Sequence, residues 1–119
     1  VQARQGGAGV LVDGFIASAA ALCAVRMDPS CADAMMLGTK SAEPGHVICI
    51  DALVASCSKG AGGAALCPPP RGPALDMGLR LGEGTGGVLC VPIVRAACDM
   101  MTRMVTLQEC LASMPPPPP

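Results

Sequence analysis

The sequence is almost devoid of aromatic residues. Among 119 residues there is one phenylalanine, Phe15, and there is neither Trp nor Tyr. Because 51% of the residues are nevertheless apolar, the interior has to be filled by Ala, Val, Leu, Cys and Met. A chain of this length suits a single domain, which buries about two thirds of the surface of the unfolded chain.

Clusters of positive charge and long apolar runs are also missing. The formal net charge is −1, and the eight basic residues are spread singly from Arg4 to Arg103 without aromatic neighbours. This distribution argues against nucleic acid as a partner. The uncharged run from Gly14 to Val25 is shorter than the ~20 residues that cross a bilayer, and Asp13 interrupts it, so we expect neither a membrane span nor a secretory signal.

Metal-binding patterns are absent as well. None of the eight cysteines forms a C-x-x-C pair, and the chain has a single histidine, His46, so a zinc site has little support and no cofactor is expected. Most of the cysteines lie in apolar runs, where Cys behaves as a small buried hydrophobe. We therefore expect free thiols, and a secreted protein held by disulfides is the alternative.

The first half of the chain predicts a strand followed by helices. The apolar triplet from Val10 to Val12, followed by Asp13-Gly14, is typical of a buried parallel strand that turns into a helix. Start and stop signals then predict three helices and one loop. They are an Ala-rich helix from Ile16 to Arg26, a short helix from Ser30 to Leu37 that stops at Gly38, a loop over 39–43, and a helix from Gly45 to Ala55.

The second half begins with a glycine- and proline-rich stretch over 56–73, which predicts a flexible surface excursion. Residues 76–81 indicate either a short helical turn or an extended lead-in. The longest helix is expected from Thr85 to about Met104, kinked or shifted near Pro92. Thr106 and Glu109 form a capping-box pattern for a last helix to Met114, before an extended tail of five prolines at 115–119.

The glycine-rich stretch LGEGTGG places one carboxylate, Glu83, among Gly82, Gly84, Gly86 and Gly87. Three of these glycines satisfy G-x-G-x-x-G, but the segment that follows is helical, so the dinucleotide fingerprint is weak. In one interpretation the glycines only make a tight helix entry, with Glu83 beside the positive end of the helix dipole. In the other, the glycines let a flat ligand approach the backbone, and Glu83 acts on it as a general base.

Two other segments are expected near the same edge of the sheet. Asp13-Gly14 closes a strand, where open α/β sheets carry their ligand crevice. The segment from Lys40 to Glu43 offers an amine, a hydroxyl and exposed backbone amides ahead of a helix, which suits a phosphate. The alternatives are a turn or helix cap for Asp13, an ordinary N-cap pair for Ser41 and Glu43, and a surface position in the first helical turn for His46.

Three segments in order resemble one known family. LVDGFIASAAAL (11–22), KSAEPGHVICIDAL (40–53) and LRLGEGTGGVLCVPIVRAAC (79–98) are together similar to the C-terminal third of nicotinate-nucleotide:dimethylbenzimidazole phosphoribosyltransferases. The resemblance implies the α/β class, with residues 1–114 as the C-terminal part of an open, parallel, Rossmann-like sheet domain that is mostly helical in this stretch. Because the chain starts at Val1 and not at Met, we expect further sequence upstream.

The family's activity is the transfer of the phosphoribosyl group of nicotinate mononucleotide to 5,6-dimethylbenzimidazole, which gives α-ribazole 5′-phosphate for cobalamin biosynthesis. The resemblance implies Glu83 as catalytic base, with substrate-binding roles for Asp13, Gly14, Ser41, Leu81, Gly82 and Gly84. It implies no metal or cofactor, these two small molecules as partners, a homodimer when complete, and the cytoplasm or an organelle as location. The alternative is a non-catalytic helical scaffold or interaction module whose glycines serve packing only.

Overall fold

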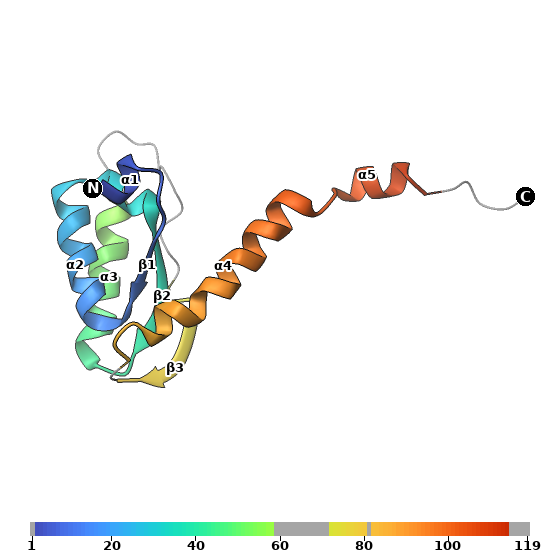
Figure 1. Ribbon diagram of the computed structural model, residues 1–119. Coiled ribbons are helices and arrows are strands. Elements are labelled where there is room, and N and C mark those ends of the chain that lie inside the picture. The colour runs from blue at the N-terminus through green and yellow to red at the C-terminus, as the bar shows by residue number, and fades with distance from the viewer. Residues whose placement is uncertain (1, 59–71, 81, 115–119) are drawn as a thin grey trace, which may run out of the picture.

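The computed structural model describes residues 2–58, 72–80 and 82–114. Its centre is a sheet of three parallel strands in the order β1-β2-β3, and helices cover both faces (Figure 1). The strands are β1 (Val10–Asp13), β2 (Met35–Ser41) and β3 (Leu75–Leu79). The predicted fold class, a mostly helical α/β arrangement around an open parallel sheet, is confirmed.

The strand order explains which helix covers which face. Helix α2 (Gly14–Met27) connects β1 to β2, and helix α3 (Pro44–Ser58) follows β2 on the way to β3. Parallel crossovers have one preferred hand, so two crossovers that advance in the same direction place α2 and α3 on the same face. After β3 the chain passes to the other face, where α4 (Thr85–Arg103) contacts all three strands.

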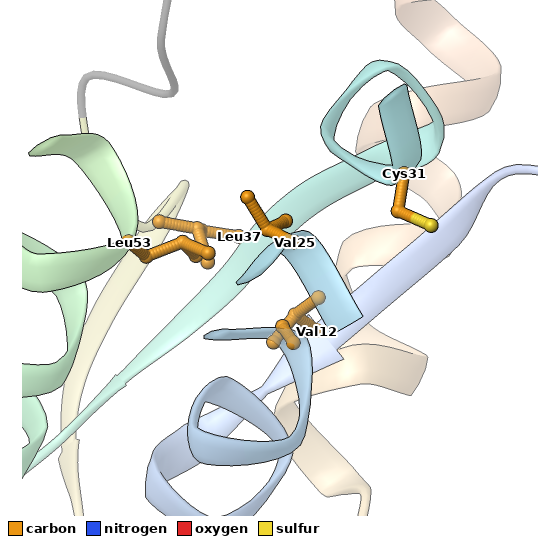
Figure 2. Close-up of a cluster of buried hydrophobic side chains, with 6 residues drawn as sticks. Val12, Val25, Cys31, Leu37 and Leu53 are labelled. Atoms are coloured by element: carbon orange, nitrogen blue, oxygen red, sulfur yellow. The ribbon is translucent and has the colours of Figure 1, made fainter. Parts of the chain in front are cut away.

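The core lies between the sheet and the helices α2 and α3. Figure 2 shows its buried side chains, which come from β1, β2, α2, α3 and the short 3₁₀ helix η1 (Pro29–Ala34). They are Val12, Ala21, Val25, Cys31, Leu37 and Leu53. The cluster contains no aromatic ring, as the composition predicts, and aliphatic and thiol groups fill it instead.

The seven cysteines that the structure describes are free thiols. This confirms the expectation for these residues, whereas Cys67 lies outside the described part of the chain. Burial raises the pKa of the Cys49 and Cys57 thiols, which keeps them in the less reactive protonated form. Within residues 2–58, 72–80 and 82–114, no group of three or more His, Cys, Asp or Glu side chains could hold a metal. None of the described helices is long and apolar enough to cross a membrane.

The short helix predicted from Ser30 to Leu37 is wrong beyond Ala34, because residues 35–41 form the central strand β2. Gly38 does not stop a helix. It lets α4 approach the sheet, since a Cβ at this position would lie 3.3 Å from the sulfur of Cys90, and the Cys90 thiol donates to the Gly38 carbonyl at 3.2 Å. Of the two alternatives for 76–81, the extended one is correct for the residues of β3.

The C-terminal helices begin where the sequence pattern predicts, although the last one ends at Ala112 and not at Met114. Helix α4 continues through Pro92, and α5 (Leu107–Ala112) begins with the predicted capping box. Thr106 Oγ1 accepts from the Glu109 amide at 3.3 Å, and the Glu109 carboxylate accepts from the Thr106 amide at 2.7 Å. The end of α4 and α5 project away from the sheet (Figure 1).

One boundary in the second half needs correction. The surface excursion predicted over 56–73 begins too early, because α3 extends to Ser58. The segments 59–71 and 115–119 lie outside the described residues. The two short elements that precede β1 and β2, α1 (Gln2–Gln5) and η1, contact each other near the amino ends of these strands.

Candidate active site

The carboxyl ends of the three strands enclose one cavity of about 710 Å³. Because the strands are parallel, the junctions β1–α2, β2–α3 and β3–α4 all meet at this edge of the sheet. Six of the predicted site residues line the cavity: Asp13, Gly14, Ser41, Gly82, Glu83 and Gly84. The seventh, Leu81, lies outside the described residues.

Glu83 occupies the tightest turn of the site. Its φ is +45°, that of Gly84 is +94°, and the Thr85 amide donates to the Gly82 carbonyl at 2.7 Å, as in a type I′ turn. Glu83 is the only non-glycine residue with positive φ among those described. Such a backbone costs about 1–3 kcal/mol, and residues held in it cluster at functional sites. The side chain is solvent-exposed at the rim of the cavity.

The β1–α2 junction presents Asp13 without a local partner. The strand register shifts between Val12 and Asp13, and Gly14 follows with φ of +67°. Asp13 stands at the N-cap of α2, but its side chain makes no capping hydrogen bond. The helix-cap alternative for Asp13 thus holds for its position but not for its side chain, and Asp13 lines the cavity together with Glu83.

The β2–α3 junction holds Ser41, which is buried. Its hydroxyl accepts from the Glu43 amide at 3.2 Å, so the cap-like alternative for this pair is present in the structure. The Ser41 amide donates to His46 at 2.7 Å, and the Ala42 amide donates to the Leu79 carbonyl at 2.8 Å. The expectation of exposed amides for a phosphate is therefore wrong at Ser41, Ala42 and Glu43, whose N–H groups bond within the protein.

Two cationic side chains line the cavity beside Ser41. The Lys40 ammonium lies 2.8 Å from the Asp76 carboxylate, and the Arg80 guanidinium lies 3.4 Å from the Glu43 carboxylate. The hydrogen bond from Lys40 lowers the pKa of Asp76. Sequence analysis missed Arg80, although its place one residue beyond β3 would have indicated it once that strand was recognised.

Thr39 is a second residue that sequence analysis missed. It is 3% exposed and lines the cavity, and its hydroxyl has no hydrogen-bond partner among the described residues. The Thr39 hydroxyl and the Asp13 carboxylate both lie against Gly86, so close that a Cβ on this glycine would collide with them. Gly86 therefore allows the first turn of α4 to sit directly on the ends of β1 and β2.

His46 is completely buried, so the expectation of a surface histidine is wrong. Its ring lies between α2 and the end of β2, where it bonds to Ser18 and to the Ser41 amide, and it is tilted against Phe15 with 6.4 Å between ring centroids. Burial lowers the pKa of His46 below its ordinary value of 6.5, and the nearby charge of Lys40 acts in the same direction. The ring is therefore neutral at physiological pH.

The lowered pKa of His46 predicts a loss of stability in mild acid. The unfolded chain takes up a proton near pH 6.5, whereas the folded chain resists it, so stability is complete above pH 6.5 and falls as the pH drops below that value. The slope is at most about 1.4 kcal/mol per pH unit. Urea titrations of the chain between pH 7.5 and 5 measure it.

His46→Gln is the control for this prediction, because the chain has no other histidine. The variant is less stable overall, but its stability is expected to be flat over the same pH range. The carboxylates with lowered pKa, Asp28, Asp76 and Glu109, lose their contributions only in more acidic solution. A parent chain with flat stability down to pH 5 would contradict the burial of a neutral ring.

A second cavity of about 630 Å³ lies at the opposite, amino-terminal end of β1 and β2. Val10, Leu11, Met35 and Met36 contribute to its lining, and its one carboxylate, Asp33, lies 3.9 Å from the guanidinium of Arg4. None of the predicted site residues lies there. The cavity at the carboxyl edge is therefore the candidate active site.

Fold and site together place the chain in a defined class, the open parallel α/β proteins whose ligand crevice lies at the carboxyl ends of the strands. Within this class, the chain belongs to the phosphoribosyltransferase family, whose family model matches residues 1–111.

Similar proteins agree with this assignment. The chain is 46% identical over 105 residues to the nicotinate-nucleotide–dimethylbenzimidazole phosphoribosyltransferase of Pseudomonas syringae pv. syringae. The aligned segment covers 88% of this chain and 25% of that protein. It is 43% identical over 114 residues to the enzyme of the same name from Ectopseudomonas mendocina, covering 96% and 28%. The crystal structure of the enzyme from Thermus thermophilus superposes with a TM-score of 0.72 at 35% identity, covering 96% of this chain and 29% of that chain. The chain thus spans about a quarter of the length of these relatives.

Proposed function

We propose that this chain carries the catalytic edge of a nicotinate-nucleotide:dimethylbenzimidazole phosphoribosyltransferase. One observation carries the proposal: Glu83, Asp13 and Ser41 come from three separate junctions and line a single cavity. These are the positions to which the family resemblance assigns the base and the nucleotide contacts. A scaffold whose glycines serve packing alone has no need of a carboxylate on a strained turn.

In the proposed reaction, one ring nitrogen of 5,6-dimethylbenzimidazole attacks C1 of the ribose. The C1–N bond to nicotinate breaks, and its electron pair neutralises the pyridinium ring, so nicotinate leaves without being protonated. The proton on the other benzimidazole nitrogen passes to the Glu83 carboxylate. One base is therefore sufficient, and a positioned base of this kind contributes about 10²–10⁴-fold to the rate.

The other residues of the cavity suit the nucleotide. Asp13 has a carboxylate without a capping bond, which can accept from ribose hydroxyls, beside the turn at Gly14. The Ser41 hydroxyl accepts from Glu43 and keeps its own proton to donate. The amides around Ser41 form hydrogen bonds within the protein. We therefore assign binding of the nucleotide's phosphate to the cationic side chains of Lys40 and Arg80, both of which line the cavity.

The test supplies the remaining three quarters of the enzyme from a relative. In a grafted enzyme, this chain replaces the matching quarter of the Pseudomonas syringae pv. syringae protein. We expect the grafted enzyme to form α-ribazole 5′-phosphate and nicotinate from the two substrates, as measured by chromatography, and the 119-residue chain alone to be inactive. A folded grafted enzyme without transfer would refute the proposal and favour the scaffold alternative. The homodimer and the cytoplasmic location stay predictions for the complete protein.

A further inference from the structure

His46 connects two of the three junctions that line the cavity. Its Nδ1 lies 2.7 Å from the Ser41 amide nitrogen at the end of β2. Its Nε2 lies 3.0 Å from the Ser18 hydroxyl on α2, which in turn lies 2.7 Å from the Gly14 carbonyl. His46 and Ser18 are both 0% exposed. A continuous chain of hydrogen bonds therefore runs from the Ser41 junction to the Gly14 turn beneath the cavity floor.

The donors in this chain determine the tautomer of the ring. The Ser41 amide can only donate, so Nδ1 is unprotonated and accepts. A neutral ring then carries its proton on Nε2 and donates it to the Ser18 hydroxyl oxygen. The Ser18 hydroxyl is left to donate to the Gly14 carbonyl. Each of the three hydrogens is donated in one hydrogen bond, and all three bonds run in the same donor-to-acceptor direction, from the end of β2 to the start of α2.

Packing holds the ring in this position. Gly45, next to His46, has no Cβ, and the space of a Cβ is taken by the Phe15 ring, whose nearest atom would lie 2.8 Å away. Phe15 follows Gly14 directly and lies tilted against the His46 ring. The two junctions are thus joined both by hydrogen bonds through His46 and by the contact between Phe15 and Gly45.

We infer that His46 is a positioning residue of the phosphoribosyltransferase, which fixes the Ser41 junction relative to the Gly14 turn so that both meet the same nucleotide. The inference rests on the proposed function. His46 is too deeply buried to touch a ligand in the cavity, so it acts through Ser41 and Gly14. Both bonds of the ring lie within the protein, so they position the two junctions independently of any contact with the nucleotide.

Two variants separate the two bonds of the ring. His46→Asn keeps an acceptor at the position of Nδ1 for the Ser41 amide and loses the reach to Ser18. His46→Gln keeps a donor near the position of Nε2 for Ser18 and loses the acceptor for Ser41. In the grafted enzyme we expect His46→Gln to raise KM for nicotinate mononucleotide about tenfold with little change in kcat, and His46→Asn, which still holds Ser41 but no longer reaches Ser18, to raise KM by a smaller factor.

Val25→Ala is the matched control for a purely structural effect. Val25 is 1% exposed in the core, on the same helix as Ser18, and does not line the cavity. This variant loses stability but should keep the parent KM. An equal rise in KM for Val25→Ala, or a KM unchanged in both His46 variants, would overturn the inference.

A measurement on the chain itself keeps this inference separate from the proposed function. Nitrogen-15 spectra of the 119-residue chain at pH 7.5 should show the proton of His46 on Nε2, with the Ser41 amide resonance shifted in His46→Gln and retained in His46→Asn. A proton on Nδ1, or an identical Ser41 shift in both variants, would refute the positioning role. An inactive grafted enzyme with intact His46 would instead refute the proposed function, while these spectra still decide the role of His46.

Discussion

Replacing Glu83 by Gln in the grafted enzyme is expected to reduce kcat by about 10²–10⁴-fold while leaving the affinity for nicotinate mononucleotide nearly unchanged. The amide keeps the size of the side chain and its place at the cavity rim but cannot take the benzimidazole proton. The nucleotide contacts assigned to Asp13 and Ser41 are untouched. Single-turnover kinetics, together with nucleotide binding measured by calorimetry, separate the two effects. A Gln variant with the parent kcat would show that another group removes the proton.

A second variant at the same position tests whether the positive φ of Glu83 destabilises the chain. Asn tolerates positive φ better than Glu, so Glu83→Asn is expected to inactivate the enzyme and also to stabilise the 119-residue chain by about 1 kcal/mol. Glu83→Gln keeps the strain and serves as the control, with stability close to that of the parent. Urea unfolding of the three proteins measures the difference. Equal stability of the Asn and Gln variants would contradict the strained turn.

Adding a methyl group to Gly86 is expected to have the second large effect. The new Cβ of Gly86→Ala would collide with the Thr39 and Asp13 side chains, so α4 has to move away from the ends of β1 and β2. Overpacking of this kind costs about 1–3 kcal/mol of stability. A displacement of about 1 Å at the reacting groups can cost ~10²-fold in rate, so turnover of the grafted enzyme should fall as well.

Gly87→Ala is the matched control for this prediction. The next glycine lies on the same helical turn, but its Cβ would lie 3.4 Å from the Asp13 Cβ, an ordinary contact. Because Ala is favoured over Gly inside a helix by about 0.8–1 kcal/mol, Gly87→Ala should keep or raise the stability of the chain. Thermal unfolding of both variants tests the pair. A similar loss of stability in both variants would mean that the close contact at Gly86 does not determine how near α4 can lie to the strands.

The fold was predictable where a local signal and the final structure agree. The strand at Val10–Asp13, the start of α4 after the glycine turn and the capping box of α5 all carry such signals. β2 was missed because Ser30 and Gly38 imitate helix start and stop signals around a short apolar run. The actual reason for Gly38 is the approach of Cys90, which is 52 residues away in sequence and therefore invisible to any local pattern.

The site was predictable because the carboxyl ends of parallel strands meet at one edge. This rule predicts that Asp13, Ser41 and Glu83 lie near one another, and all three line the same cavity. It could not show which polar groups were already bonded inside the protein. It therefore gives the wrong environment for the Ala42 amide, which bonds to Leu79 of β3, and for the His46 ring, which is buried where α3 packs against Ser18 of α2.

The two-residue turn at Glu83 also has an evolutionary consequence. Gly or Asn at this position relieves the strain of the positive φ, so selection for stability alone favours replacement of the glutamate. Only a requirement for the carboxylate opposes that drift. A gene copy released from selection is therefore expected to lose this glutamate early while its product still folds, which makes residue 83 an indicator of whether a given copy is still in use.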